Sequence, residues 1–192
     1  MTDSDETQLL LTENMLTNNG SPELGNTFSD ITIVEFGDYQ CTFCYKFHQN
    51  TLNQINEQYI KSGQVKYIYR DFPLNGNDSI LASEASYCAG EQNRYWEYHD
   101  VLYNNWAGEK TGWINSNSLT EFAVEIDLNI FEFQQCLNGH KYYQQVIDNQ
   151  NYAKSIGIDA TPYFLIFDDE KLVRIVGAEP FEKFQNAINQ FE

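Results

Sequence analysis

The chain has 192 residues, which fits one domain or one domain with a large insertion, and 42% of them are hydrophobic, which excludes a disordered protein. Its 28 acidic and 11 basic residues give a formal net charge of -17 at pH 7, so we expect no nucleic acid partner and no attraction to anionic membranes. The longest apolar runs, such as residues 163–167, are far shorter than the roughly 18–20 residues that span a bilayer, so no membrane span is predicted.

The surface is expected to be acidic and rich in amides, because the chain holds 20 Asn and 14 Gln but only 3 Arg and 8 Lys. One interpretation is a halophilic protein, since salt screens the self-repulsion of so many like charges. The alternative is an ordinary acidic secreted protein encoded by an AT-rich genome. Composition leaves both interpretations open.

The amino-terminal part is polar, and its turn formers at residues 18–22 predict a flexible arm over residues 1–26. The arm has no basic segment that leads into an apolar one, so no secretory signal peptide is predicted in this chain. Two locations remain open on this ground. One is the cytoplasm, and the other is an extracytoplasmic compartment reached by a form whose signal has been removed.

A run of β-branched and aromatic residues at 31–36 predicts a strand that is buried on both faces. A helical pattern of apolar residues follows from Cys41 to about Gly63, and a second strand is predicted at residues 65–69. Strand, helix and strand within about forty residues have the length of a βαβ unit with a right-handed crossover.

From residue 75 to about residue 156 the chain is predicted to be helical throughout. Ser118 and Glu121 have the spacing of a capping box, which predicts that one of these helices starts at Ser118. Further helices are predicted at residues 129–137 and 143–157. About eighty helical residues are therefore expected between two β regions.

The last part of the chain returns to strand. Two strands at residues 163–167 and 172–176 flank a turn-like acidic segment, which predicts an antiparallel hairpin. An amphipathic helix with aromatic residues on one stripe follows at residues 181–191.

Cys41 and Cys44 form a C-x-x-C motif at the point where a predicted strand leads into a helix. The helix amino terminus stabilises an anion, because its amide donors are unpaired and its dipole is positive there, so Cys41 should have a lowered pKa and attack as a thiolate. Cys44 lies one helical turn later, where it can resolve a mixed disulfide by attacking the sulfur of Cys41. The position of the motif therefore predicts redox chemistry.

The motif has two alternative interpretations. It could be half of a zinc site, but a closed tetrahedral site needs two further ligands, usually as a second close pair. The other candidate ligands are isolated in the sequence: Cys88, Cys136, His48, His99 and His140. A purely structural disulfide is the second alternative, although closing so small a loop removes little entropy from the unfolded chain. No metal is therefore expected, and no cofactor is needed.

Two further features accompany the motif. Glu35 lies in an otherwise apolar strand six residues before Cys41, where a carboxylate is costly unless it is paired or takes part in proton transfer. A solvated edge position is the alternative for Glu35. Thr161 and Pro162 come directly before a predicted strand, where a proline marks an edge or a tight turn and a cis bond can occur.

The chain resembles the DsbA-like thioredoxin-fold oxidoreductases from about residue 24 to residue 191, with the motifs in that family's order. These motifs are Thr32 to Phe36, Asp38 to Cys44, Tyr69 to Leu74, Cys88-Ala89, Tyr95 to Asp100, Cys136-Leu137 and Ala160 to Phe164. The resemblance implies an α/β thioredoxin fold with an inserted all-helical subdomain. Its expected parts are residues 27–74, the insertion at 75–157 and residues 158–192.

The resemblance also implies roles for single residues. Cys41 would be the nucleophile and Cys44 the resolving thiol. Glu35 matches the family's buried acid, and Pro162, preceded by Thr161, would present backbone to a bound peptide. Between the cysteines this chain has Thr42-Phe43 in place of the Pro-His of the best-known members. Since a histidine there stabilises the thiolate, these two supporting residues argue against extreme oxidising strength.

The leading hypothesis is an extracytoplasmic thiol oxidase, acting as a monomer, that introduces disulfides into unfolded or newly exported proteins and is reoxidised by a quinone-linked membrane partner. A reductase or isomerase on the same fold is the first alternative. The second is a non-catalytic module in which the aromatic-rich insertion captures peptides. Turnover that requires both Cys41 and Cys44 would separate the enzyme from the module.

Cys88 and Cys136 are predicted to form a second, structural disulfide. If Cys41 pairs with Cys44, this is the one pairing that four cysteines leave. Both residues lie on apolar helical stripes and could face each other across a pair of helices. The alternative is two separate buried thiols that act as small hydrophobic groups.

Overall fold

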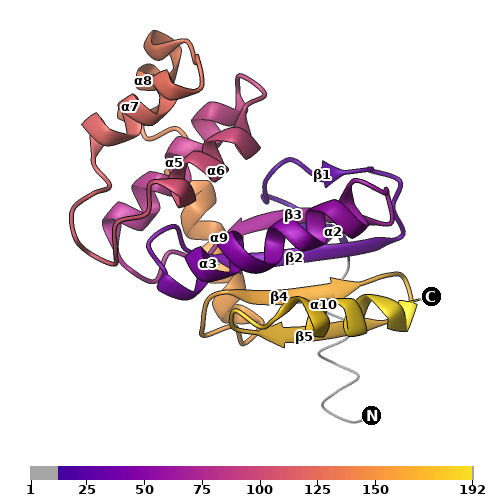
Figure 1. The fold of residues 1–192 in the computed structure, drawn as a ribbon. Helices are drawn as coiled ribbons and strands as arrows, with labels where there is room; N and C mark the ends of the chain where they lie inside the picture. The colour runs from indigo at the N-terminus through magenta and orange to yellow at the C-terminus, as the bar shows by residue number, and fades with distance from the viewer. Residues whose placement is uncertain (1–12, 192) are drawn as a thin grey trace.

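The computed structural model describes residues 13–191, which form one mixed five-stranded sheet and the helices packed around it (Figure 1). The strand order is β1-β3-β2-β4-β5. The strands are β1 (Leu24–Gly25), β2 (Ile31–Gly37), β3 (Val65–Asp71), β4 (Tyr163–Phe167) and β5 (Leu172–Val176). This is the α/β thioredoxin fold that the resemblance implied.

Strand β2 lies at the centre of the sheet and is buried along its whole length. It runs parallel to β3, with Ile31 opposite Val65, and antiparallel to β4, with Glu35 opposite Phe164. A parallel neighbour requires a crossover, and the helical segment between β2 and β3 supplies it. The predicted βαβ unit and the predicted β4–β5 hairpin are both present.

The crossover begins as α3 (Thr42–Phe47) and continues without a break to Ile60. Two π-helical segments, η1 (His48–Leu52) and η2 (Asn56–Ile60), flank the short α4 (Asn53–Ile55). Together with α10 (Phe181–Ile188) and the 3-10 turn η3 (Asn189–Phe191), this helix covers one face of the sheet. In the shared core the rings of Phe47, Phe164 and Phe184 contact one another at tilted and edge-on angles.

Four helices form a separate layer beyond one end of the sheet (Figure 1). They are α5 (Asn77–Gly90), α6 (Tyr95–Asn104), α7 (Ser116–Glu125) and α8 (Ile130–Asn138). Their core reaches the cysteine motif, because Cys44, Tyr39 and Tyr69 belong to the same buried cluster as Leu102 and Phe133. The insertion is therefore packed directly against the motif.

The fifth helix of the region expected as an insertion belongs to both layers. Helix α9 (Tyr143–Ser155) contacts α5 near its start and β3 near its end. Ala153 packs in the same cluster as Val34, Phe36 and Ile68 of the sheet. A boundary at residue 157 thus marks the end of the helical sequence, whereas packing against the sheet begins inside α9.

The start of α7 differs from the prediction. The N-cap is Asn115, whose side chain accepts from the amides of Asn117 and Ser118, and Ser118 in turn accepts from the Asn115 amide. The capping box is therefore Asn115 with Ser118, and the prediction of Ser118 with Glu121 was wrong by three residues. Asparagine is as good an N-cap as serine, and spacing alone did not separate the two.

The expected flexible arm over residues 1–26 is replaced by ordered structure in its described part, while residues 1–12 lie outside the described residues. Helix α2 (Glu13–Thr17) buries Leu16 fully, and β1 pairs antiparallel with β3. The buried Arg70 guanidinium donates to the carbonyls of Met15 and Leu16. This long-range anchor has no local signal in a polar sequence, which explains the difference.

None of the described helices is both long and apolar enough to cross a membrane.

Cys88 and Cys136 are joined by a disulfide that links α5 to α8, with their Cα atoms 5.7 Å apart. The bond closes a loop across 48 positions of the chain. Constraining the unfolded state in this way stabilises a protein by about 2–4 kcal/mol. The insertion therefore carries a covalent cross-link in addition to its packed core.

A variant in which both Cys88 and Cys136 are replaced by alanine is expected to unfold with a free energy lower by about 2–4 kcal/mol. Urea denaturation of the oxidised proteins measures the difference. A Cys41→Ala/Cys44→Ala protein keeps only the Cys88–Cys136 bond. Adding a reductant should lower its free energy of unfolding by the same amount. Equal stability with and without the bond would contradict the expectation.

Candidate active site

The cysteine motif begins directly after the central strand. Strand β2 ends at Gly37, a tight turn follows, and Cys41 is the N-cap of α3 with Cys44 in the first helical turn. The turn is held by the buried Asp38 carboxylate, which accepts from the Gln40 amide and from the amide and side chain of Asn75. Both thiols are free and mostly buried.

The surroundings of Cys41 favour its thiolate. A hydrogen bond from the Cys44 thiol, with smaller contributions from the Thr161 side chain and from the amides of Cys44 and Phe43, outweighs the effect of burial and lowers the pKa of Cys41 to about 7. The Sγ atom of Cys41 lies 3.4 Å from the Thr161 carbonyl oxygen. Burial instead raises the pKa of Cys44 well above its ordinary value. The two thiols are therefore chemically distinct.

Titration of the reduced protein is expected to show one thiolate with a midpoint near pH 7. Thiolate absorbance, together with the pH dependence of alkylation, measures it, and Cys41 should be alkylated first because its pKa is lowered whereas that of the fully buried Cys44 is raised. A Cys41→Ser variant is the control that must lose this titration. A midpoint near 8.5, the value of a free cysteine, would contradict the expectation.

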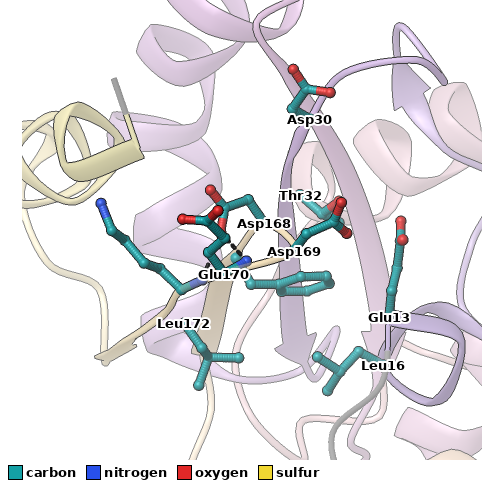
Figure 2. Close-up of a pocket in the computed structure, with 10 residues that line it drawn as sticks. Glu13, Leu16, Asp30, Thr32, Asp168, Asp169, Glu170 and Leu172 are labelled. Atoms are coloured by element: carbon teal, nitrogen blue, oxygen red, sulfur yellow. Dashed lines mark hydrogen bonds between the residues drawn. The ribbon is translucent and has the colours of Figure 1, made fainter.

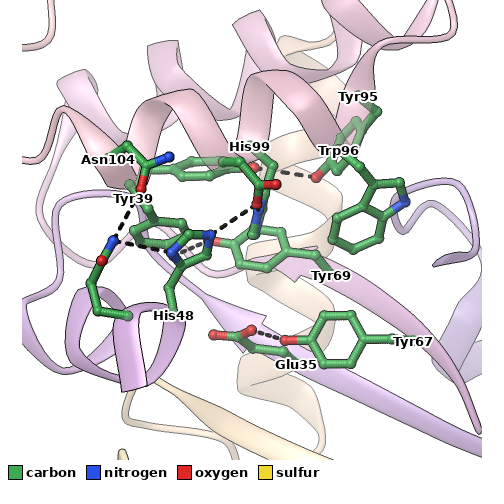
Figure 3. A network of polar contacts seen from close by, with 12 residues as sticks. Glu35, Tyr39, His48, Tyr67, Tyr69, Tyr95, Trp96, His99 and Asn104 are labelled. Atoms are coloured by element: carbon green, nitrogen blue, oxygen red, sulfur yellow. Dashed lines mark hydrogen bonds and ion pairs between the residues drawn. The ribbon is translucent and has the colours of Figure 1, made fainter. Parts of the chain in front are cut away.

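Glu35 is almost fully buried in the central strand and not at a solvated edge. One carboxylate oxygen accepts a hydrogen bond from the Tyr67 hydroxyl, and the other, Oε1, has no partner among the described residues (Figure 3). Burial raises the pKa of Glu35 to about 8, although the Tyr67 bond lowers it and the charge of Cys41 raises it further. A buried carboxyl with this pKa can gain and lose a proton near neutral pH.

Thr161 and Pro162 lie opposite Cys41, at the start of β4. The bond between them is cis, and the Thr161 carbonyl contacts the Cys41 sulfur. The Pro162 carbonyl accepts from the Gly177 amide, which ties the segment to the end of β5. Between the two cysteines Phe43 is 56% exposed. The structure thus brings Thr161 and Pro162 next to the C-x-x-C motif.

A loop after α6 also contacts the motif, and the sequence analysis missed it. Gln40, directly before Cys41, accepts at its carbonyl from the Trp106 indole and at its side chain from the Lys110 amide. Glu109 of the same loop accepts from both the amide and the hydroxyl of Thr42. These contacts join residues nearly seventy positions apart, and no local pattern marks them.

A cluster of buried rings forms the wall between the motif and the insertion, and it was also missed. The hydroxyl groups of Tyr69 and Tyr103 form a hydrogen bond. The hydroxyl groups of Tyr39 and Tyr95 form another (Figure 3). Burial raises the pKa of the tyrosines Tyr39, Tyr69, Tyr95 and Tyr103 well above the ordinary value. These rings are therefore neutral, and they pack as amphipathic core residues.

Among the described residues, the one group of three with metal-ligating spacing consists of His48, His99 and Asp100. The Asp100 carboxylate oxygen lies 2.9 Å from Nε2 of His48 and 3.4 Å from Nδ1 of His99 (Figure 3). Burial lowers the pKa of His99 to about 4, so its ring is neutral. The group contains neither Cys41 nor Cys44, so it does not complete the zinc site weighed for the motif.

A surface pocket of about 230 Å³ lies near the start of β2, whereas the cysteines follow its end (Figure 2). Most of its polar lining residues are acidic, namely Glu13, Asp30 and the turn at residues 168–170, and the others are Thr32 and Lys171. Asp168 there accepts from the amides of Glu170 and Lys171, which fixes the β4–β5 turn. The pocket holds no thiol and is separate from the candidate active site.

Comparisons with known proteins agree with this geometry. A family model described as Thioredoxin matches residues 17–190. The chain is 25% identical over 158 residues to disulfide bond formation protein D of Bacillus subtilis, a match that covers 81% of this chain and 70% of that protein. It is also similar to the crystal structure of Wolbachia pipientis α-DsbA1, with a TM-score of 0.80, 27% identity and coverage of 96% of this chain and 94% of that one. The oxidised BdbD of Bacillus subtilis has the same fold, with a TM-score of 0.78, 23% identity and coverage of 88% and 91%.

Proposed function

The chain belongs to the thioredoxin family, and on that premise we propose that it is a thiol-disulfide oxidoreductase that exchanges disulfides with client proteins through Cys41 and Cys44. The observation that carries the proposal is the contrast between the two thiols. Cys41 has a lowered pKa and adjoins the Thr161–Pro162 segment, whereas Cys44 is buried with a raised pKa. Disulfide exchange needs one thiol that leaves easily as a thiolate and a second that is protected from client proteins.

The exchange runs through a mixed disulfide. In the oxidised enzyme a client thiolate attacks the Cys41 sulfur and forms a bond to it. The Cys41–Cys44 bond breaks at the same time, and Cys44 leaves as a thiolate that takes up a proton. A second client thiolate then attacks the client sulfur of the mixed disulfide and expels the Cys41 thiolate. The client loses two electrons and gains one disulfide, and the enzyme becomes the dithiol. A leaving thiol of low pKa speeds the second step.

Glu35 is proposed to hold the proton that Cys44 takes up and releases. Its charge acts on Cys44, and its pKa of about 8 lies near neutral pH, where a proton donor and acceptor is most effective. The unpaired Oε1 atom leaves it free to exchange that proton. Tyr67 fixes the other oxygen and so orients the carboxyl group.

Thr161 and Pro162 are proposed to bind the client backbone beside Cys41. The position of these two residues supports this role. The Thr161 carbonyl contacts the Cys41 sulfur, and the segment leads directly into β4, which is paired with β5. Phe43 is proposed to give an apolar contact, because it is exposed next to Cys41, while Thr42 serves as the first helical residue. Unfolded client proteins expose both backbone and apolar side chains, which fits these two contacts.

The proposed direction is oxidation of clients outside the cytoplasm. The Cys88–Cys136 disulfide supports this location, because structural disulfides persist in oxidising compartments. The name of the Bacillus relative also refers to disulfide bond formation. In this proposal a membrane protein linked to quinone reoxidises the dithiol and the enzyme acts as a monomer. Reduction or isomerisation of client disulfides is the alternative on the same site.

The test is recovery of activity by a reduced, denatured protein that needs its native disulfides. The oxidised enzyme is expected to restore that activity in proportion to the enzyme added, with one disulfide formed per enzyme dithiol produced. A protein that binds the denatured client without forming disulfides would be a peptide-binding module, and the proposal would fail.

A further inference from the structure

The loop that follows α6 is fixed against the residue that precedes the reactive cysteine. The Trp106 indole nitrogen lies 2.9 Å from the Gln40 carbonyl oxygen, and the Lys110 amide lies 2.9 Å from the Gln40 side-chain oxygen. The Trp106 ring also stacks on Tyr45 of α3, with centroids 4.5 Å apart. Gln40 itself is fully buried and donates to Ser79. The loop is therefore held in place on both sides of Glu109.

Glu109 places a carboxylate at the first residue of the helix that begins after Cys41. Its Oε1 atom lies 2.9 Å from the Thr42 amide nitrogen and 2.8 Å from the Thr42 hydroxyl oxygen. The hydrogen bond from the Thr42 amide has the larger effect and that from the Thr42 hydroxyl the smaller, and both lower the pKa of Glu109 below its ordinary value. The Glu109 carboxyl group is therefore ionised at neutral pH. A negative charge thus lies at the helix end that should stabilise the Cys41 thiolate.

We propose that Glu109 is a positioning residue that moderates the oxidising strength of the Cys41–Cys44 pair by competing with the Cys41 thiolate for the start of helix α3. This inference rests on the proposed function, because it assigns Cys41 as the nucleophile. Its physical basis is repulsion between two anions at one helix terminus, which destabilises the thiolate and therefore the reduced protein.

Thr42 makes the contact possible. A proline at this position would have neither an amide hydrogen nor a hydroxyl group, so Glu109 would lose both donors. Because this chain has Thr42 where the best-known members have proline, Glu109 can bind at the start of the helix and act on the Cys41 thiolate. Proline is compatible with the first position of a helix, so Thr42→Pro removes the contact while keeping the backbone conformation.

In the described part of the chain, other titratable groups also act on Cys41 and Glu109 or lie close to them. The Cys44 thiol acts on the titration of Cys41, and the charge of Cys41 in turn raises the pKa of Glu35. Glu109 is influenced by the neighbouring Lys110, and Lys46 lies over the exposed ring of Phe43. Replacing Glu109 alone changes none of these groups.

The test uses Glu109→Gln, which keeps an acceptor oxygen for Thr42 and removes the charge. The midpoint of Cys41 titration is expected to fall by about 0.5 pH unit, since Glu109 is exposed and solvent screens it. The equilibrium with glutathione should shift about threefold towards the reduced enzyme, which corresponds to about 15 mV. Both shifts should shrink in 1 M salt, where the Debye length is about 3 Å.

Two further variants make the test specific. In a Thr42→Pro protein, Glu109→Gln is expected to have no further effect, because the carboxylate is no longer held there. Glu121→Gln, an exposed residue of α7, removes the same charge and should leave the titration unchanged. Equal midpoints for the wild type and Glu109→Gln would overturn the inference. A wild-type midpoint near 8.5 would instead overturn the proposed function.

Discussion

Replacing Cys41 by serine is expected to reduce disulfide transfer to a client to the rate measured without enzyme. The client thiolate would then have no disulfide to attack, and the thiol whose pKa is lowered to about 7 would be absent. Recovery of activity by a reduced, denatured client measures the loss. A Cys88→Ala/Cys136→Ala protein is the matched control, because it also loses a disulfide but should still transfer its own.

Replacing Cys44 by serine should abolish turnover in a different way. Such a protein keeps the Cys41 thiolate, so it is expected to form a mixed disulfide with a client disulfide and to remain bound, since the resolving thiol is missing. Electrophoresis without reductant would detect the linked species, and a reductant would release it. Substantial turnover by either single variant would contradict the assignment of the two cysteines.

Replacing Glu35 by glutamine is expected to make the protein more stable at high pH. In the folded wild type the pKa of Glu35 is raised to about 8 by burial, whereas in the unfolded chain it has its ordinary value of 4.5. The folded state therefore binds the extra proton between these values, and wild-type stability falls as the pH rises through this range. Glutamine cannot ionise, and it still accepts from Tyr67, so the variant avoids this loss.

The advantage of Glu35→Gln should grow from near zero at pH 4.5 to at most about 5 kcal/mol above pH 8. Urea denaturation of the oxidised proteins at several pH values measures it, and oxidation removes the Cys41 charge from the comparison. Tyr67→Phe is the matched variant, since it removes the hydrogen bond that lowers the Glu35 pKa and should increase the loss at high pH. A difference that does not vary with pH would contradict the raised pKa.

The sequence predicted those parts of the molecule whose signals are local. The run at residues 31–36 is hydrophobic because β2 is buried on both faces, and the strand-to-helix position of Cys41 follows from that strand. The hairpin of β4 and β5 is marked by its acidic turn. In each case the sequence pattern lies within one short stretch of the chain, so it can be recognised without knowing which distant segments pack against it.

Features made by long-range contacts were not predictable in this way. Residues 13–26 are polar, yet Arg70 anchors them through two backbone carbonyls. The Glu109 contact with Thr42 and the tyrosine cluster around His99 likewise join segments that are far apart in the chain. Such contacts depend on how the helical insertion packs against the motif. The sequence around a single polar or aromatic residue does not indicate which distant residue it will contact.

The reduction potential of the Cys41–Cys44 pair, measured by equilibrium with glutathione, tests the central claim most directly. The proposed direction, oxidation of client proteins, requires a cysteine pair that is more oxidising than thioredoxin, whose potential is about -270 mV. The pair should remain less oxidising than about -120 mV, the value of DsbA, since Thr42-Phe43 replaces a motif histidine and Glu109 opposes the thiolate. We therefore expect a potential between about -230 and -120 mV. A potential at or below about -270 mV would identify a reductant and contradict the account.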